Sequence, residues 1–105
     1  MEKKPIVSVI IPHYNSPELL NKAILSADIN ENVEIIVIDD KSQLTQSQFD
    51  TLERFCNMHH VRFYRNTTDK KGAGACRNIG LEYMTGDWLL LLDADDFLSM
   101  AVMKL

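Results

Sequence analysis

The sequence contains few cysteines and no long hydrophobic run, and both absences narrow the class of protein. Its two cysteines, Cys56 and Cys76, lie in helical patterns without CxxC spacing, so buried, reduced thiols are expected and no disulfide framework is available. The longest apolar run, Trp88–Leu92, has five residues, whereas a membrane-spanning helix needs about 20. The polar start, Met-Glu-Lys-Lys-Pro, argues against a signal peptide. We therefore expect a cytoplasmic protein, placed at the cytoplasmic membrane face if a longer protein carries a span.

Positive charge is also scarce. Eleven Lys and Arg stand against 15 Asp and Glu, which gives a formal net charge of −4. Sequence-independent nucleic-acid binding needs a basic footprint, so no nucleic-acid partner is expected. Small anions are not excluded, because a metal ion or a few well-placed donors can reverse the local sign. With 105 residues the chain is long enough for one core and too short for two, and we expect residues 1–105 to form a single domain.

Short apolar runs alternate with helix-like segments along the chain. The expected strands are Ile6–Ile11, Val33–Ile38, Val61–Tyr64 and Trp88–Leu92, with Pro12 ending the first. The expected helices follow Ser16 and Thr45, which are typical N-cap residues, and the third covers Gly72–Met84. Strand–helix alternation of this kind predicts an α/β fold with a parallel sheet and right-handed crossovers.

Ligands of such sheets bind outside the carboxyl ends of the strands, where the strand order reverses. The segments that follow the four expected strands are all polar: residues 12–15, 39–42, 65–71 and 93–96. A purely structural domain needs turns at these places but not this many carboxylates. We therefore look for function in these four segments.

The strongest cluster is Asp93-Ala94-Asp95-Asp96, directly after a strand. An Asp-x-Asp segment leaving a strand can offer two hard oxygen ligands to Mg²⁺ or Mn²⁺, with substrate phosphates supplying the rest. The alternative is helix capping by Asp95 or Asp96 from Phe97 onward. Asp96 as a cap, with Asp93 and Asp95 facing a ligand, satisfies both interpretations.

Asp39 and Asp40 close the second strand, where a carboxylate can accept hydrogen bonds from a ribose hydroxyl or a base N–H. The alternative is an Asx turn with Ser42. Tyr14, just beyond the first strand, could lie against a nucleobase or form the edge of the core. Its neighbour Asn15 is either a turn former or a ligand contact.

Three histidines and one glycine-rich segment complete the candidates. His13 has no evident partner, and the pair at 59–60 is interpreted as solvated loop. The segment Lys70–Arg77 does not match a dinucleotide or Walker A loop. Its glycines allow close backbone approach at a helix N-terminus, with Lys71 and Arg77 as cationic neighbours, which suits a diphosphate or a sugar. A tight helix entry with solvated lysines is the alternative.

Together these segments resemble the N-terminal half of the family 2 glycosyltransferases. VSVIIPHYNSPELLNKAI is similar to that family's opening strand, Pro-x-Tyr-Asn turn and first helix, and VEIIVIDDKS to its acidic second-strand end. GAGACRNIGLEYMTGDWLLLLDADD is similar to its third helix, fourth strand and Asp-x-Asp segment. The resemblance covers nearly the whole chain. It implies a GT-A type fold, a Rossmann-like three-layer sandwich with a mostly parallel sheet, here truncated after the fourth strand.

The resemblance also implies a nucleotide-diphospho-sugar donor, in many members a UDP-sugar, with Mn²⁺ or Mg²⁺ as cofactor. The metal ligands it implies are Asp93 and Asp95. The implied nucleotide-sugar contacts are Pro12, Tyr14, Asn15, Asp39, Asp40, Gly72, Arg77, Asp93 and Ala94. Where members commonly have Gly-Ser after the acidic pair, this chain has Lys41-Ser42, and because lysine adopts positive φ less easily than glycine, the turn is expected to differ.

The implied reaction is displacement at the anomeric carbon by an acceptor hydroxyl of a saccharide or lipid-linked glycan. In the family the acceptor site and the general base lie further downstream, so the catalytic base is expected beyond residue 105. A non-catalytic nucleotide-binding or interaction module is the alternative, since it would share every donor-side residue. Exposure of the surface that a downstream half would cover makes self-association a further hypothesis.

Overall fold

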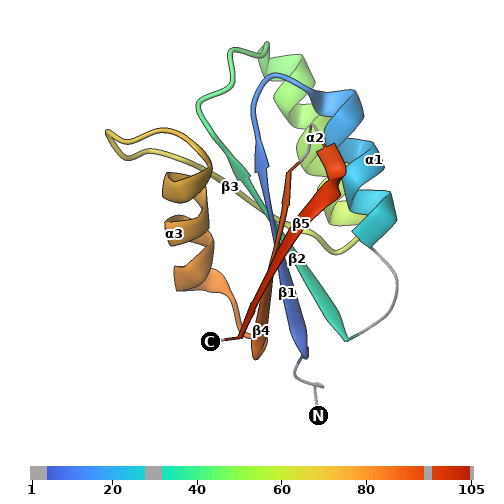
Figure 1. Cartoon of the computed structure of the whole chain (residues 1–105). Coiled ribbons are helices and arrows are strands. Elements are labelled where there is room, and N and C mark those ends of the chain that lie inside the picture. Colours follow the sequence, from blue (N-terminus) through green and yellow to red (C-terminus); the bar gives the residue numbers. More distant parts are fainter. Residues whose placement is uncertain (1–4, 28–31, 94–95, 105) are drawn as a thin grey trace.

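The computed structural model describes residues 5–27, 32–93 and 96–104, with side chains described as far as residue 92. Strands and helices alternate along the chain until the last strand (Figure 1). The elements are β1 (Val7–His13), α1 (Pro17–Ala27), β2 (Val33–Asp39), α2 (Gln46–Met58), β3 (Arg62–Arg65), α3 (Ala73–Tyr83), β4 (Trp88–Asp93) and β5 (Asp96–Lys104). The predicted order of four strands and three helices is confirmed.

The strands form one sheet in the order β3-β2-β1-β4-β5. The β1–β2, β1–β4 and β2–β3 pairs are parallel, which confirms the predicted sheet. The sheet does not end at the fourth strand as expected, because β5 pairs antiparallel with β4. This strand also replaces the helix that Asp95 or Asp96 was expected to cap from Phe97 onward.

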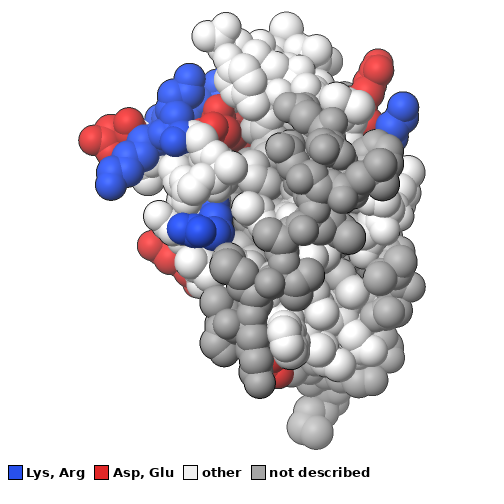
Figure 2. Space-filling view, in the orientation of Figure 1, with Lys and Arg blue, Asp and Glu red and all other residues white. Residues whose placement is uncertain are grey.

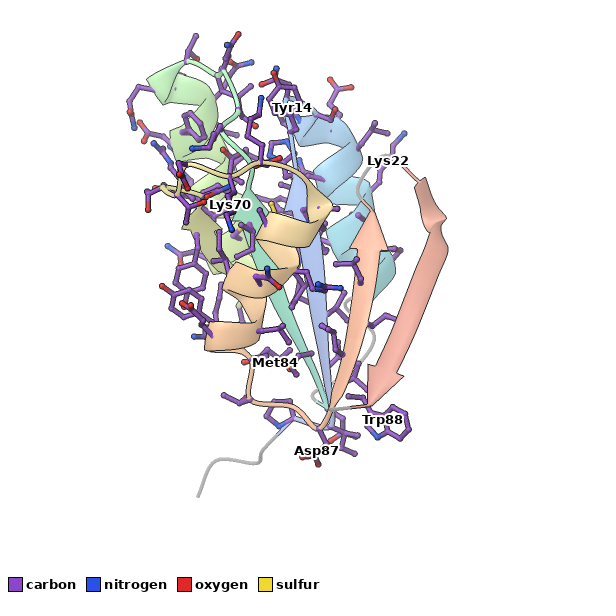
Figure 3. All side chains as sticks on the ribbon, turned by 60° about the vertical axis from the view of Figure 1, so that its left-hand side comes forward. Tyr14, Lys22, Lys70, Met84, Asp87 and Trp88 are labelled. Atoms are coloured by element: carbon purple, nitrogen blue, oxygen red, sulfur yellow. The ribbon has the colours of Figure 1, made fainter. Side chains whose placement is uncertain are left out.

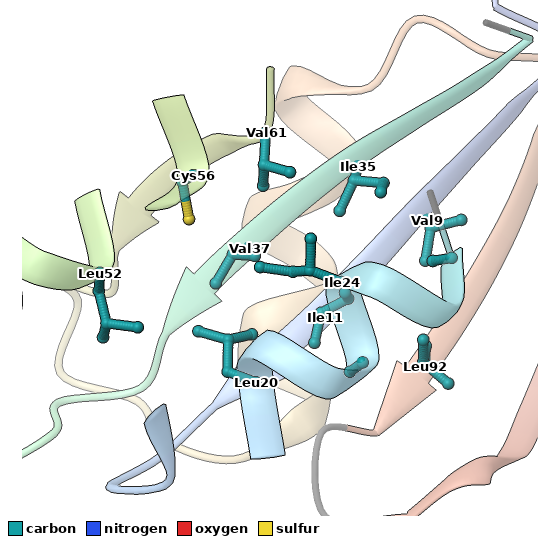
Figure 4. Packing of buried hydrophobic residues seen from close by; sticks show 12 residues of the cluster. Val9, Ile11, Leu20, Ile24, Ile35, Val37, Leu52, Cys56, Val61 and Leu92 are labelled. Carbon is teal, nitrogen blue, oxygen red and sulfur yellow. The ribbon is translucent and has the colours of Figure 1, made fainter. Parts of the chain in front are cut away.

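Helices cover both faces of the sheet. On one face α1 and α2 pack over a cluster of buried residues that includes Val9, Ile11, Ile24 and Leu52 (Figure 4). On the other face α3 covers a smaller cluster that includes Ile10, Ile36 and Cys76. Neighbouring residues of β1 and β2 therefore enter opposite clusters, which explains why their sequences are continuously apolar.

Pro12 does not end the first strand, contrary to expectation. The Asp40 N–H donates to the His13 carbonyl on the β2 side at 2.7 Å, so the backbone of Pro12 faces the β4 side. There the β1–β4 pairing has already ended at Ile10↔Leu91. Since no partner strand needs an N–H at this position, the proline costs the ladder no hydrogen bond.

The helix boundaries follow local chemistry. Ser16 accepts the first hydrogen bond of α1, from Leu20 N–H at 2.9 Å. The capping box of Thr45 and Gln48 is confirmed at the start of α2, with reciprocal bonds of 3.1 and 2.9 Å. Gly72, the residue before α3, has φ +100°, a conformation that favours glycine. Within the described residues no helix is long and apolar enough to cross a membrane.

Candidate functional site

The candidate site lies at the carboxyl edge of the sheet, where the segments after β1, β2 and β3 meet. Strand order reverses between β1 and β4, since the chain moves from β1 outward to β2 and β3 before it returns to β4. Tyr14 and Lys70 lie at this end of the molecule, and Asp87 and Trp88 lie at the opposite end (Figure 3). Ligands of open α/β sheets bind at the carboxyl edge next to such a reversal, so this edge is the candidate site.

Asp39 is a buried structural carboxylate. Its Oδ1 lies 2.8 Å from His13 Nδ1, and its Oδ2 accepts the Ser42 N–H at 3.0 Å, which confirms the Asx turn. Both Asp39 and His13 are only 1% exposed. Burial would raise the pKa of Asp39, but the hydrogen bonds from His13 and Ser42 outweigh it and lower the pKa below its ordinary value.

His13 has the partner that the sequence analysis failed to find. Its Nε2 accepts the Ser16 N–H at 2.9 Å, so in this arrangement the ring proton sits on Nδ1 and is donated to Asp39. The ring thereby joins the ends of β1 and β2 to the start of α1. The alternation of strands and helices in the sequence gave no signal of this contact, because residues 13 and 39 become neighbours only through the parallel pairing of β1 and β2, in which His13 lies opposite Asp39.

Asn15 is a turn former. It has φ +53°, its N–H donates to Ser42 Oγ at 2.8 Å, and its Oδ1 accepts the Gln43 N–H at 2.7 Å. Asparagine tolerates this left-handed conformation better than most residues. These bonds fasten the segment after β1 to the segment after β2.

Asp40 differs from Asp39 in both exposure and partners. It is half-buried, its Oδ1 accepts from Asn66 Nδ2 at 3.0 Å, and its Oδ2 accepts the Gly72 N–H at 2.8 Å. The Cys76 thiol also hydrogen-bonds to Asp40, and because a carboxylate has about four acceptor sites, capacity for one ligand donor remains. The contacts orient Asp40 towards the segment that leads into α3.

Asn66 is a positioning residue that the sequence analysis missed. It is 5% exposed, and besides Asp40 its Nδ2 donates to the Lys70 carbonyl at 2.7 Å. Its Oδ1 accepts from the N–H and the hydroxyl of Thr68 at 2.9 and 2.6 Å. An Asn directly after a strand was the available signal, but such a residue is common in ordinary turns.

Lys41 adopts the left-handed conformation that was expected to be difficult for it, with φ +62°. This chain therefore makes the turn after the acidic pair with a left-handed lysine. Its ammonium donates to the Thr68 carbonyl, in the segment that follows β3. This bond ties two of the site's segments together.

Tyr14 presents its ring at the edge, since 46% of the residue is exposed. Lys71 Nζ lies 5.6 Å from the ring centroid, so an exposed cation borders the aromatic face. Pro12 below it is half-buried. Lys and Arg side chains gather with acidic ones at the upper left of the molecule, where the segment after β3 lies (Figure 2).

Arg77 lies in the second turn of α3 and is half-buried. Its Nε is buried without a hydrogen-bond partner among the described residues, and its Nη2 is 3.5 Å from Asn78 Oδ1. A buried guanidinium donor is costly to leave unpaired, so the position favours an anion or another acceptor.

Cys76 lies beneath the carboxylates, fully buried in the first turn of α3. Burial, then the charges of Asp40 and Asp39, raise the pKa of its thiol to about 12. Burial likewise raises the pKa of Cys56 to about 11. Both thiols are therefore protonated at neutral pH, as the expectation of buried cysteines requires, and neither serves as a nucleophile.

The Asp-x-Asp segment falls at the edge of the part of the chain that the structure describes. Ala94 and Asp95 lie outside the described residues, as do the side chains of Asp93 and Asp96. β4, the strand next to β1 in the sheet, ends at Asp93. Within the described part of the chain, no group of three or more His, Cys, Asp or Glu residues could hold a metal ion.

A hollow of about 470 Å³ borders Asn15 on the side of α1 and α2. Among the described residues that line it, Glu18 is the one with a charge, and the others are amide, hydroxyl and apolar. A diphosphate is not attracted to such a lining, so the carboxyl edge remains the candidate site.

His59, expected in a solvated loop, is half-buried, and the centroid of its ring lies 4.5 Å from that of the Phe55 ring.

Comparison with known proteins gives a family. The sequence profile described as glycosyl transferase family 2 matches residues 8–103. An uncharacterized glycosyltransferase of Haemophilus influenzae is 37% identical over 98 residues, which cover 90% of this chain and 38% of that protein. The chain spans between 13% and 38% of the length of the curated relatives that it matches.

Solved structures have the same fold. Residues 1–349 of TarS from Staphylococcus aureus, in complex with UDP-GlcNAc, align with a TM-score of 0.67 at 29% identity, over 86% of this chain and 26% of that one. The mannosyltransferase PcManGT from Pyrobaculum calidifontis, in complex with GDP-Man and Mn²⁺, aligns with a TM-score of 0.68 at 26% identity, over 89% and 28%. The predicted GT-A type fold is thereby confirmed.

Proposed function

The chain belongs to glycosyl transferase family 2, and from this premise we propose that it forms the donor-binding part of a glycosyltransferase. The donor is a nucleotide-diphospho-sugar, whose sugar passes to an acceptor hydroxyl of a saccharide or lipid-linked glycan. One observation carries the proposal: the exposed ring of Tyr14, which borders Lys71, and the oriented carboxylate of Asp40, which binds the next residue Gly72, lie at the same carboxyl edge of the sheet. We propose that residues 1–105 act as one nucleotide-sugar-binding domain.

The base would lie between these two groups. The Tyr14 ring offers an apolar face, and Asp40 offers acceptor capacity for a base N–H or a ribose hydroxyl. Asp39 and Asn15 act on the ligand indirectly, because their polar atoms already bond to His13, Ser42 and Gln43. This division assigns base contact to Asp40 and support to Asp39. Pro12 supports Tyr14 from the end of β1.

The diphosphate would lie toward the start of α3. Lys71 brings positive charge beside Tyr14, Gly72 has no side chain to obstruct close approach, and Arg77 has a buried donor without a partner among the described residues. Guanidinium and backbone N–H groups at a helix start are suited to phosphate oxygens. Local positive charge of this kind explains how an acidic chain could take a polyanion.

A divalent cation, Mn²⁺ or Mg²⁺, completes the proposed donor site. Carboxylates are the hard oxygen donors that such ions take, and Asp93 closes β4 beside β1 at the same edge. Asp93 and Asp95 would hold the ion, with Ala94 between them. When bound, the ion would neutralise charge on the departing diphosphate. TarS with UDP-GlcNAc and PcManGT with GDP-Man and Mn²⁺ support this donor class, and we propose a UDP-sugar.

Calorimetric titration of UDP into the chain, with Mn²⁺ and then with EDTA, tests the proposal. We expect metal-dependent binding that Asp95→Ala weakens at least about tenfold, because one metal ligand is lost. Asp69→Asn is the matched control, since Asp69 is an exposed carboxylate in the segment after β3, and it should bind as the native chain does.

Three outcomes would contradict parts of the proposal. UDP binding that ignores both EDTA and Asp95→Ala would overturn the metal assignment and retain the nucleotide site. A folded chain that binds neither UDP nor GDP would overturn the donor-binding function. Binding without any transfer in a longer protein would favour a non-catalytic module.

A further inference from the structure

Lys41 combines a strained backbone conformation, which its turn uses, with a side-chain bond that leaves the turn for another segment. Its φ of +62° disfavours a residue with a Cβ by about 1 kcal/mol relative to glycine. The side chain is exposed, so burial does not offset that strain. What lysine adds here is the bond from its ammonium to the Thr68 carbonyl.

The segment that receives this bond, residues 66–72, has little else to hold it. Residues 67–72 are all exposed, so apolar burial contributes little to their position. Asn66 anchors one end through Asp40 and Thr68, and the Gly72 N–H anchors the other end on Asp40 Oδ2. The bonds of Asn66 to the Asp39 carbonyl at 2.7 Å and to Asp40, with those of Gly72 to Asp40 and of Lys41 to Thr68, therefore decide where this segment lies.

The Thr68 carbonyl is held in place as an acceptor by the other hydrogen bonds of Thr68. Its N–H and hydroxyl donate to Asn66 Oδ1, and its Oγ1 accepts the Lys70 N–H at 3.2 Å. Lys41 and Asp40, adjacent in the chain, thus hold segment 66–72 at its middle and at its two ends. The end of that segment carries Lys71 over Tyr14 and the Gly72 N–H.

We propose that Lys41 is a positioning residue that holds segment 66–72 against the β2–α2 segment, so that Lys71 and Gly72 are in place before a nucleotide binds. The consequence for binding rests on the proposed donor function, whereas the bond to Thr68 does not. A preorganised site binds more tightly because the ligand does not have to order the segment. Lys41→Met tests this, since methionine retains the length and the strained φ but lacks the donor.

Hydrogen exchange in the ligand-free chain measures the contact itself. In Lys41→Met we expect the Thr68 and Gly72 amides to exchange about tenfold faster, the effect of losing one charge-assisted hydrogen bond. Lys41→Arg should restore near-native exchange, because a guanidinium also donates to a carbonyl. Lys70→Met removes the same charge from an exposed lysine of the segment and should leave both amides unchanged.

Calorimetry with UDP then measures the consequence. Lys41→Met should raise Kd about fivefold or more, Lys41→Arg should restore native affinity, and Lys70→Met should change Kd less than about twofold. Native exchange at Thr68 and Gly72 in Lys41→Met, or an unchanged Kd despite faster exchange, would overturn the positioning role. If every variant including the native chain failed to bind UDP, the donor function would be contradicted, and the exchange rates alone would decide whether Lys41 holds the segment.

Discussion

Asp39 and Asp40 are adjacent, identical in side chain and opposite in role. In a strand, neighbouring side chains point to opposite faces, so the two carboxylates enter different surroundings as β2 ends. Asp39 turns to His13 and is buried, while Asp40 turns to the start of α3 and remains half-exposed. The sequence shows an acidic pair, and only the spatial neighbours assign one member to structure and the other to the proposed ligand.

Exchanging each carboxylate for an amide should separate these roles. Asp39→Asn leaves His13 and Ser42 with a poorer acceptor in a buried place, so we expect a loss of about 2 kcal/mol in the free energy of unfolding, measured by urea denaturation. Asp40→Asn should weaken UDP binding about tenfold or more by calorimetry, with a smaller loss of stability. A stable Asp39→Asn chain that no longer binds UDP would reverse the assignment.

At the scale of elements, α3 carries the start of the proposed phosphate site and must lie close to the sheet. Gly80 makes this approach possible, because a Cβ there would meet Ile10 Cδ1, Cγ1 and Cγ2 at 2.5, 2.8 and 2.9 Å. Ile10 is fully buried, so its side chain has little room to move. A glycine in mid-helix was readable from the sequence, but its neighbour on β1 was not.

Gly80→Ala should therefore destabilise the chain by about 1–3 kcal/mol, the usual cost of overpacking a core. Gly74→Ala is the matched control in the same helix, because nothing lies within 4 Å of its added Cβ. It should be neutral or stabilising by up to about 1 kcal/mol, since alanine loses less entropy in a helix. Urea unfolding of both variants checks this, and equal stabilities would show that α3 is not tightly packed on β1.

At the scale of the whole molecule, β2 carries a hydrogen-bonded carboxylate at each end of the sheet. Asp39 lies at the carboxyl end, and Glu34 at the amino end accepts from Ser8, Arg62 and Thr85 at 2.7 to 2.9 Å. Burial raises the pKa of Glu34, but those hydrogen bonds outweigh it and lower the pKa below 4.5. Both ends of the fold thus favour ionised carboxylates.

The stability of the chain should consequently fall in acid. Because the folded pKa values of Asp39 and Glu34 lie below their ordinary values of 3.8 and 4.5, their contribution is complete above about pH 5 and is lost as pH falls through the folded values. Urea unfolding between about pH 3 and 7 measures this loss. Glu34→Gln should flatten the slope, and Glu82→Gln, which changes an exposed carboxylate of α3, should not. A slope that is the same in all three chains would contradict the assignment.

The sequence by itself determined the order of strands and helices, because continuous β-branched runs and helical apolar stripes are local patterns. It also determined the capping box of α2 and the polar segments at the carboxyl edge, which depend on residue type and spacing. From the sequence, Pro12 was predicted to end a strand, and a helix was predicted after Asp96. Both predictions were wrong because local rules do not include the neighbouring strand with which a segment pairs. β1 continues through Pro12 because its pairing with β4 has ended at Ile10. Residues 96–104 form β5 because the other edge of β4 is available for antiparallel pairing.

Only the tertiary structure decided which polar groups meet. His13 and Asp39, Asp40 and Gly72, and Lys41 and Thr68 are separated by 26, 32 and 27 residues in the sequence. Parallel pairing brings such residues together at one edge, and the periodicity of each strand carries no record of its neighbour's register. The types of residue at the site were therefore predictable from the sequence, whereas their partners, and so their roles, depended on the assembly of the sheet.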